Sequence, residues 1–167
     1  MALTQAPSAG VKQLILSTSA FGPREIEQIT RAVVENYANY RELREAVQEL
    51  ENQPSRTPAT AARLGVCLYL LGRYSDAVSM LAHSDGGAMT HYYLGKAYLA
   101  LDRYGEAITA YESSEKAGYE RYVVRLALAE AYRYDHRLED SLKLLDGLSG
   151  AIEQTAEYLF QRALTVQ

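Results

Sequence analysis

Cysteine and histidine are scarce in this 167-residue sequence, tryptophan is absent, and acidic residues outnumber basic ones. The one cysteine, Cys67, excludes an internal disulfide, and its place on an apolar helix face predicts a small buried side chain. Neither Cys67 nor the histidines His83, His91 and His136 have a partner at metal-ligand spacing. The formal net charge of −4 argues against a nucleic-acid-binding domain, whose basic footprint would be visible. No metal, no cofactor and no direct nucleic-acid contact are therefore expected.

The N-terminal region also lacks a long apolar run. The apolar run Leu14-Ile15-Leu16 is bounded by Lys12 on one side and by serine and threonine on the other. It is therefore too short for the apolar core of a secretory signal or for a membrane span. The sequence therefore predicts a soluble, cytoplasmic protein with no membrane partner.

No catalytic constellation is present. His83-Ser84-Asp85 contains the residue types of a hydrolytic triad. Consecutive residues in one loop, however, cannot place the nucleophile and the carboxylate on opposite sides of the imidazole. Gly147-Leu148-Ser149-Gly150 lacks the lysine and the length of a phosphate-binding loop. The sequence predicts a protein that is not an enzyme.

The dominant pattern that is present is a recurring pair of apolar helical stripes. Apolar and small residues recur at steps of three and four within residues 62–81, 91–112 and 124–145. Small residues hold matching positions, and antiparallel helices approach closely only where such residues meet. These positions are Gly65, Ala77, Gly95, Ala107 and Ala129. A period of about 30 to 34 residues made of paired helices indicates a helical solenoid.

These residues resemble the tetratricopeptide repeat family. The central copy fits best, through Gly95, Tyr98 and Ala107. The first copy has a loop that is four residues short, and the third has Ser141 where alanine is expected. The resemblance implies an all-α fold, a right-handed α-α superhelix of antiparallel helix pairs, with three repeats across residues 58–147.

The regions flanking these repeats leave alternatives open. Residues 1–22 are either a tail or a segment whose Val11 to Leu16 caps the solenoid. Residues 23–53 are either one helix that begins at Pro23 or a degenerate repeat of two helices. Residues 151–167 are either a capping helix or the start of a further repeat, in a fragment of a longer protein.

The last helix is expected from Ile152 to Val166, where an apolar stripe runs along the chain. The stripe consists of Ile152, Ala156, Leu159, Ala163 and Val166.

In the family, the first helix of each pair lines a concave groove that binds a partner. Carried over position by position, the resemblance places Ala62, Val66, Val123 and Leu126 in this groove together with the candidate partner-binding residues. These candidates are Tyr69, Met89, Tyr92, Lys96, Leu99, Glu130, Arg133 and Tyr134. Tyrosines there would offer large contact area with few rotors to freeze, and Lys96 or Arg133 would pair with an acidic group. The alternative is that the tyrosines are ordinary, partly covered surface residues.

One family sub-pattern is missing. The version that clamps a peptide's terminal carboxylate uses lysine, asparagine and arginine at five positions, which here hold Ala62, Val66, Tyr93, Val123 and Ala127. A groove of aromatic and aliphatic residues favours instead a peptide with apolar anchors.

The sequence therefore predicts a non-catalytic scaffold that binds a peptide or protein segment in the groove, as part of a larger protein or assembly. One alternative is a structural module that forms a homodimer through its terminal helices. Another follows from residues 19–51, which are similar to the leader of bacterial proteins that join such repeats to an RNA polymerase α-subunit-like C-terminal domain. That similarity implies a transcription-linked protein.

Overall fold

A computed structural model describes residues 10–166, whereas residues 1–9 of the predicted tail and residue 167 lie outside the described part. The described residues form ten α-helices and one 3₁₀-helix, without strands. The helices are α1 (Val11–Leu16), α2 (Pro23–Glu35), α3 (Tyr37–Glu51), α4 (Pro58–Leu70), α5 (Tyr74–Leu81), α6 (Ala88–Leu99), α7 (Tyr104–Lys116), α8 (Arg121–Tyr134), α9 (Leu138–Asp146), η1 (Gly150–Gln154) and α10 (Ala156–Thr165).

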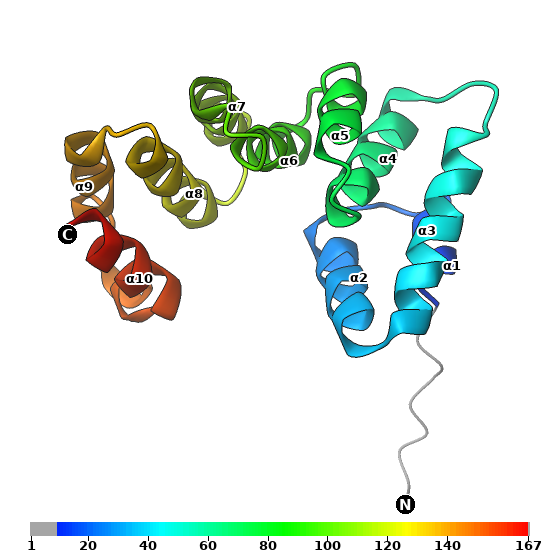
Figure 1. The fold of residues 1–167 in the computed structure, drawn as a ribbon, viewed down its shortest axis with the longest axis horizontal. Helices are drawn as coiled ribbons and strands as arrows, with labels where there is room; N and C mark the ends of the chain where they lie inside the picture. Colours follow the sequence, from blue (N-terminus) through cyan, green and yellow to red (C-terminus); the bar gives the residue numbers. More distant parts are fainter. Residues whose placement is uncertain (1–9, 167) are drawn as a thin grey trace, which may run out of the picture.

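Helices that are adjacent in sequence pack as pairs, and the pairs stack side by side. The pairs are α2–α3, α4–α5, α6–α7 and α8–α9, and α5–α6 and α7–α8 join successive pairs. The stack curves, so that α2 and α10 lie at its two ends on the same side (Figure 1). The predicted fold class, an all-α solenoid of helix pairs, is confirmed.

The small residues of the repeat pattern allow this close packing. A Cβ atom on Gly65 would lie 2.5 Å from Cγ of Leu81, and one on Gly95 would lie 2.6 Å from the Tyr111 ring. Ala77, Ala107 and Ala129 are completely buried. At Gly65 and Gly95, one helix therefore leaves room for a side chain of its partner helix.

A shared turn joins the two helices of each repeat. Gly72, Asp102 and His136 hold the left-handed conformation, with φ of 76°, 57° and 60°. The next residue is an arginine in all three turns, and its backbone N–H donates to a carbonyl five residues back, at 2.8 to 2.9 Å. This Schellman-type bond satisfies a carbonyl at the end of the first helix.

The same arginine stabilises the start of the second helix. The guanidinium groups of Arg73, Arg103 and Arg137 each pair with a carboxylate three residues ahead, at 2.7 Å. Because these pairs are exposed, each contributes little to stability on its own.

The first repeat differs from the others in a helix and not in a loop. Helix α5 has 8 residues, whereas α7 has 13. Six residues lie between α5 and α6, and four lie between α7 and α8. The predicted short loop is therefore wrong, because the missing residues come from the second helix of the pair.

The N-terminal segment packs against the solenoid. Val11 and Ile15 of α1 are 2% and 0% exposed, and α1 contacts α3 and α2. Arg63 of α4 donates hydrogen bonds to the backbone carbonyls of Ile15, Ser17 and Ser19, which hold the α1–α2 connection against α4. Residues 23–51 form two helices, because Asn36 takes an extended conformation and its side chain accepts from the N–H of Ala38.

The last helix is shorter than expected and buries a different face. Thr155 caps its start, accepting from the Tyr158 N–H at 3.2 Å, so α10 begins at Ala156. It buries Tyr158, Gln161 and Thr165, whereas Leu159 and Val166 of the predicted stripe are 54% and 63% exposed. The predicted stripe is thus wrong as a core face, because α8 and α9 pack on the opposite side of the helix.

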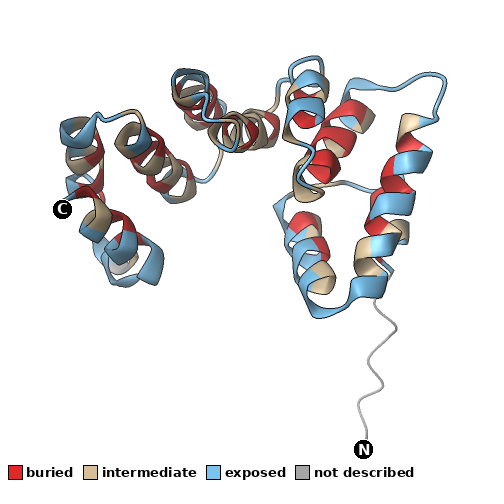
Figure 2. Cartoon of the chain, viewed as in Figure 1, coloured by how far each residue is buried: buried red, intermediate tan, exposed pale blue. Residues whose placement is uncertain are grey.

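The buried side chains form three consecutive clusters along the chain. Figure 2 marks the buried residues in red along the helices. The largest cluster extends from α1 to α6, the second joins α6, α7 and α8, and the third joins α8, α9 and α10. Cys67 belongs to the first cluster and is completely buried, as its apolar surroundings predict. None of the described helices is long and apolar enough to cross a membrane.

Candidate functional site

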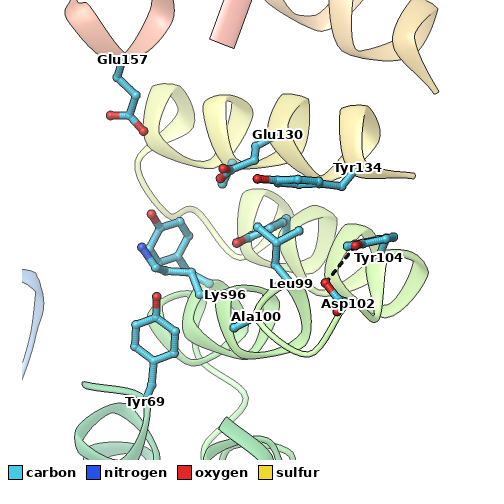
Figure 3. A pocket seen from close by; sticks show the side chains of 12 residues that line it. Tyr69, Lys96, Leu99, Ala100, Asp102, Tyr104, Glu130, Tyr134 and Glu157 are labelled. Atoms are coloured by element: carbon cyan, nitrogen blue, oxygen red, sulfur yellow. Dashed lines mark hydrogen bonds between the residues drawn. The ribbon is translucent and has the colours of Figure 1, made fainter. Parts of the chain in front are cut away.

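A hollow of about 400 Å³ lies where α4, α6, α8 and α10 approach one another on the inner side of the curve (Figure 3). We refer to it as the concave hollow. Its lining residues are Tyr69, Tyr92, Lys96, Leu99, Ala100, Asp102, Tyr104, Tyr111, Ala127, Glu130, Tyr134 and Glu157.

Most of the candidate residues from the sequence come together here. The six that line the hollow are Tyr69, Tyr92, Lys96, Leu99, Glu130 and Tyr134. The other two do not line it: Met89 packs against the first core cluster, and Arg133 lies against the Tyr134 ring at 4.3 Å. Ala62, Val66 and Leu126, which the family pattern also places in the groove, are 2%, 0% and 3% exposed and belong to the core.

Tyrosine rings build one wall of the hollow as a connected cluster. Tyr69 and Tyr93 pack edge to face at 5.6 Å between ring centroids, and Tyr93 packs against Tyr92 at 5.4 Å. Tyr92 also stacks on Tyr119 at 4.7 Å, and it touches the buried Tyr111. Rings that support one another in this way are held in place before any partner arrives, so this wall is rigid.

A second tyrosine pair stands at the other end of the hollow. Tyr104 of α7 and Tyr134 of α8 stack at 5.8 Å, with 14° between their planes. The Tyr104 hydroxyl donates to Oδ1 of Asp102 at 2.9 Å (Figure 3). Tyr134 as a residue remains 42% exposed, so this pair lies at the rim of the hollow.

Lys96 contacts aromatic rings inside the hollow. Its ammonium nitrogen lies 5.6 Å from the Tyr69 ring centroid and 5.5 Å from that of Tyr92, within cation–π range. Burial lowers the pKa of Lys96, and the nearby Glu130 and Glu157 act in the opposite direction. The lysine is therefore positioned by the protein itself and does not form a free arm.

Burial keeps the phenols of the hollow neutral. It raises the pKa of Tyr69 to about 12 and also raises that of Tyr92 and Tyr111. The charge of Glu130 contributes to the raised pKa of Tyr69 and of Tyr111. At neutral pH these tyrosines can each donate and accept one hydrogen bond to a guest.

Some lining residues were not predicted from the sequence. Asp102 and Tyr104 belong to the turn between α6 and α7, and Glu157 comes from α10. The repeat pattern assigns the groove to the first helix of each pair, so it gives no signal for a turn or for the last helix. Only the closure of the curve brings Glu157 over the hollow (Figure 3).

The histidines outside the hollow lie in surroundings that the structure explains. His83 is exposed and its Nδ1 lies 2.9 Å from the Ser79 carbonyl oxygen, and His136 occupies a turn. Within residues 10–166, no three or more histidine, cysteine or acidic side chains gather as a metal site would require.

Comparison with known proteins agrees with this architecture. A family model described as "Anaphase-promoting complex, cyclosome, subunit 3" matches residues 37–114, which span α3 to most of α7. No curated protein matches the sequence.

Two crystal structures show a similar fold. Both contain nearly identical TPR-like repeats of a protein assigned as a kinesin light chain from Podosopora anserina, one of them as a variant with a single substitution. The variant is 17% identical with a TM-score of 0.58, and covers 88% of this chain and 86% of its own. The other is 16% identical with a TM-score of 0.58, and the shares are 87% and 86%.

The chain therefore has the fold of tetratricopeptide-like repeats, as the sequence resemblance predicts. The curvature of such a solenoid creates an extended concave surface.

Proposed function

We propose that this chain is a non-catalytic interaction scaffold that binds a segment of a partner protein in the concave hollow, within a larger cytoplasmic assembly. The observation that carries the proposal is the convergence of α4, α6, α8 and α10 on one rigid aromatic hollow. Its volume of about 400 Å³ lies in the range of pockets that accept a side chain or small ligand. Rigid tyrosines lose little conformational entropy on binding, which favours affinity.

The test is affinity capture from the native cell followed by mass spectrometry, with a variant that fills the hollow. Ala100 is exposed, lines the hollow and ends α6, so Ala100→Phe adds bulk there without removing a packed side chain. Ala117 ends α7 in a similar backbone conformation and does not line the hollow, so Ala117→Phe is the matched control. Tyr92→Ala is less suitable, because Tyr92 packs against three other tyrosines.

We expect a set of proteins that is captured by the wild type and by Ala117→Phe but is lost with Ala100→Phe. Recovery of the same proteins with all three would remove the hollow from the proposal. If the lost set contains RNA polymerase subunits, the transcription-linked alternative is favoured.

A second candidate function is self-association through α10. Leu159, Phe160 and Val166 are 54%, 60% and 63% exposed, and such an apolar group at one end of a solenoid suits contact with a second copy. Light scattering over a range of concentrations should then give the mass of a dimer, and Phe160→Glu should return the mass to that of one chain. Val34 of α2 is 82% exposed, so Val34→Glu serves as the control that leaves the dimer intact.

A further inference from the structure

The concave hollow carries an excess of negative charge. Three carboxylates, those of Asp102, Glu130 and Glu157, line it together with one ammonium group, that of Lys96. Its formal charge at neutral pH is therefore −2. None of the ion pairs found within residues 10–166 involves Glu130 or Glu157. These two carboxylates therefore have no cationic partner at salt-bridge distance.

The two ends of the hollow differ in charge and in what occupies them. At one end, Lys96 already lies against the rings of Tyr69 and Tyr92. Towards the other end, Glu130 of α8 lies beside Tyr134, which stacks on Tyr104, and Asp102 lies next to Tyr104 (Figure 3). The first end contains a built-in cation, whereas at the second the lining supplies two carboxylates and an aromatic pair.

We propose that the second end accepts an arginine or lysine side chain of the partner segment, held between Glu130 and Asp102 and against the Tyr104–Tyr134 pair. This inference rests on the proposed function, which it deepens by naming the chemistry of the partner. The same hollow disfavours an acidic anchor, because that group would face three carboxylates and could pair only with Lys96.

Charge complementarity and ring geometry both support a basic guest. A cation over a tyrosine face is attracted by the ring, and an adjacent carboxylate adds a charge-assisted hydrogen bond. Arginine is the better fit of the two, because its planar guanidinium can stack on a ring while its edge donates to a carboxylate. Arg133 already lies over the Tyr134 ring at 4.3 Å, so a guest cation would meet the pair on its Tyr104 side.

The sequence pattern suggested a different pairing, with Lys96 or Arg133 reaching an acidic group of the partner. In the structure both cations are already engaged with tyrosine rings. The unpaired charges that line the hollow are carboxylates, so the preferred guest has the opposite sign.

The test begins with a phage-displayed library of random peptides of about 12 residues, panned on the full chain. Selected peptides are retained only if they bind the wild type and Ala117→Phe but not Ala100→Phe. Their affinities are then measured by calorimetry with Glu130→Gln and Asp102→Asn, which remove charge while keeping shape. Glu139 is an exposed residue of α9 that does not line the hollow, so Glu139→Gln gives the same change in net charge as a control.

We expect the retained peptides to share an arginine or lysine at one position. Replacing that residue by glutamine should weaken binding about 10-fold, and Glu130→Gln and Asp102→Asn should each weaken it to a similar extent. The peptide substitution should have little further effect once both carboxylates are removed, whereas Glu139→Gln should leave the affinity unchanged.

Two results overturn this inference in different ways. Retained peptides that lack a basic residue, or that share an acidic one, contradict the basic guest and leave the proposed function standing. A selection in which no peptide depends on the hollow removes the proposed function, and the inference with it.

Discussion

Single residues decide how closely the helices approach, and Gly95 is the sharpest case. Its absent side chain makes room for the Tyr111 ring, which is 1% exposed and closes the floor of the hollow. Tyr111 therefore cannot fill its place unless position 95 is a glycine. Gly95 therefore determines both how closely α6 and α7 pack and where the Tyr111 ring lies in the hollow.

Gly95→Ala should lower the free energy of unfolding by about 1 to 3 kcal/mol, because the added methyl group overpacks a buried ring. Gly105 of α7 has no atom within 4 Å of an added Cβ, so Gly105→Ala should raise the free energy of unfolding by about 0.5 to 1 kcal/mol. Urea unfolding of both variants measures the contrast. Equal effects in the two variants would show that the helices are not in contact at Gly95.

Cys67 links burial to the pH dependence of stability. Burial raises the pKa of its thiol to about 12, whereas in the unfolded chain it loses its proton near pH 8.5. Above that pH the unfolded state gains stability by ionising, and the folded state does not. The contribution of the buried Cys67 thiol to the free energy of unfolding is thus fully present below about pH 8.5 and is lost as the pH rises towards 12.

Between pH 9 and pH 10.5 the wild type should therefore lose stability more steeply than Cys67→Ala. The difference in slope should approach about 1.4 kcal/mol per pH unit, the value for one proton. Ionisation of the tyrosines affects both proteins and cancels in the comparison. Parallel curves in urea unfolding would mean that the thiol ionises equally in both states.

At the scale of elements, the turns between paired helices show how a left-handed backbone conformation affects stability. His136 holds φ of 60°, and Gly72 takes the same place in the first repeat with φ of 76°. A residue with a Cβ atom is strained in this region by about 1 to 2 kcal/mol, whereas glycine is not.

His136→Gly should consequently stabilise the protein by about 0.5 to 1 kcal/mol, since part of the relieved strain is offset by the greater entropy of an unfolded glycine. Gly72→Ala should have the opposite sign. Thermal unfolding of the two variants checks the pair, and a destabilised His136→Gly would show that the side chain of His136 has a stabilising contact in this turn.

The helix pairs could be predicted from the sequence because their causes are local. Small residues at fixed spacing, as at Gly65 and Gly95, follow from the contact between neighbouring helices, and that contact repeats along the chain. The burial of Cys67 follows from its apolar helix face in the same way.

The parts that were not predicted depend on contacts between distant segments. The stripe through Leu159 and Val166 is as apolar as a core face, yet the packing of α10 on α8 and α9 turns it outward. Likewise, Glu157 and Asp102 reach the hollow only because the whole stack curves. A helical period identifies the apolar side of a helix but not which side the rest of the chain covers.

At the scale of the whole molecule, the three core clusters imply that stability is distributed unevenly. The cluster from α1 to α6 contains 15 buried residues, and the one between α8, α9 and α10 contains five. In a solenoid each repeat contacts only its neighbours, so the two ends can open with different free energies. The C-terminal end should open first.

Leu145→Ala tests this division, because Leu145 is completely buried in the C-terminal cluster. The substitution should cost about 2 to 5 kcal/mol locally and should speed native-state hydrogen exchange in α8, α9 and α10. Exchange in α3 and α4 should change little, since their side chains belong to a different cluster. Leu159→Ala, at a position 54% exposed, is the matched control and should leave all helices as in the wild type. Uniform acceleration by Leu145→Ala would mean that the solenoid unfolds as one cooperative unit, and that the hollow cannot open at its α10 side without global unfolding.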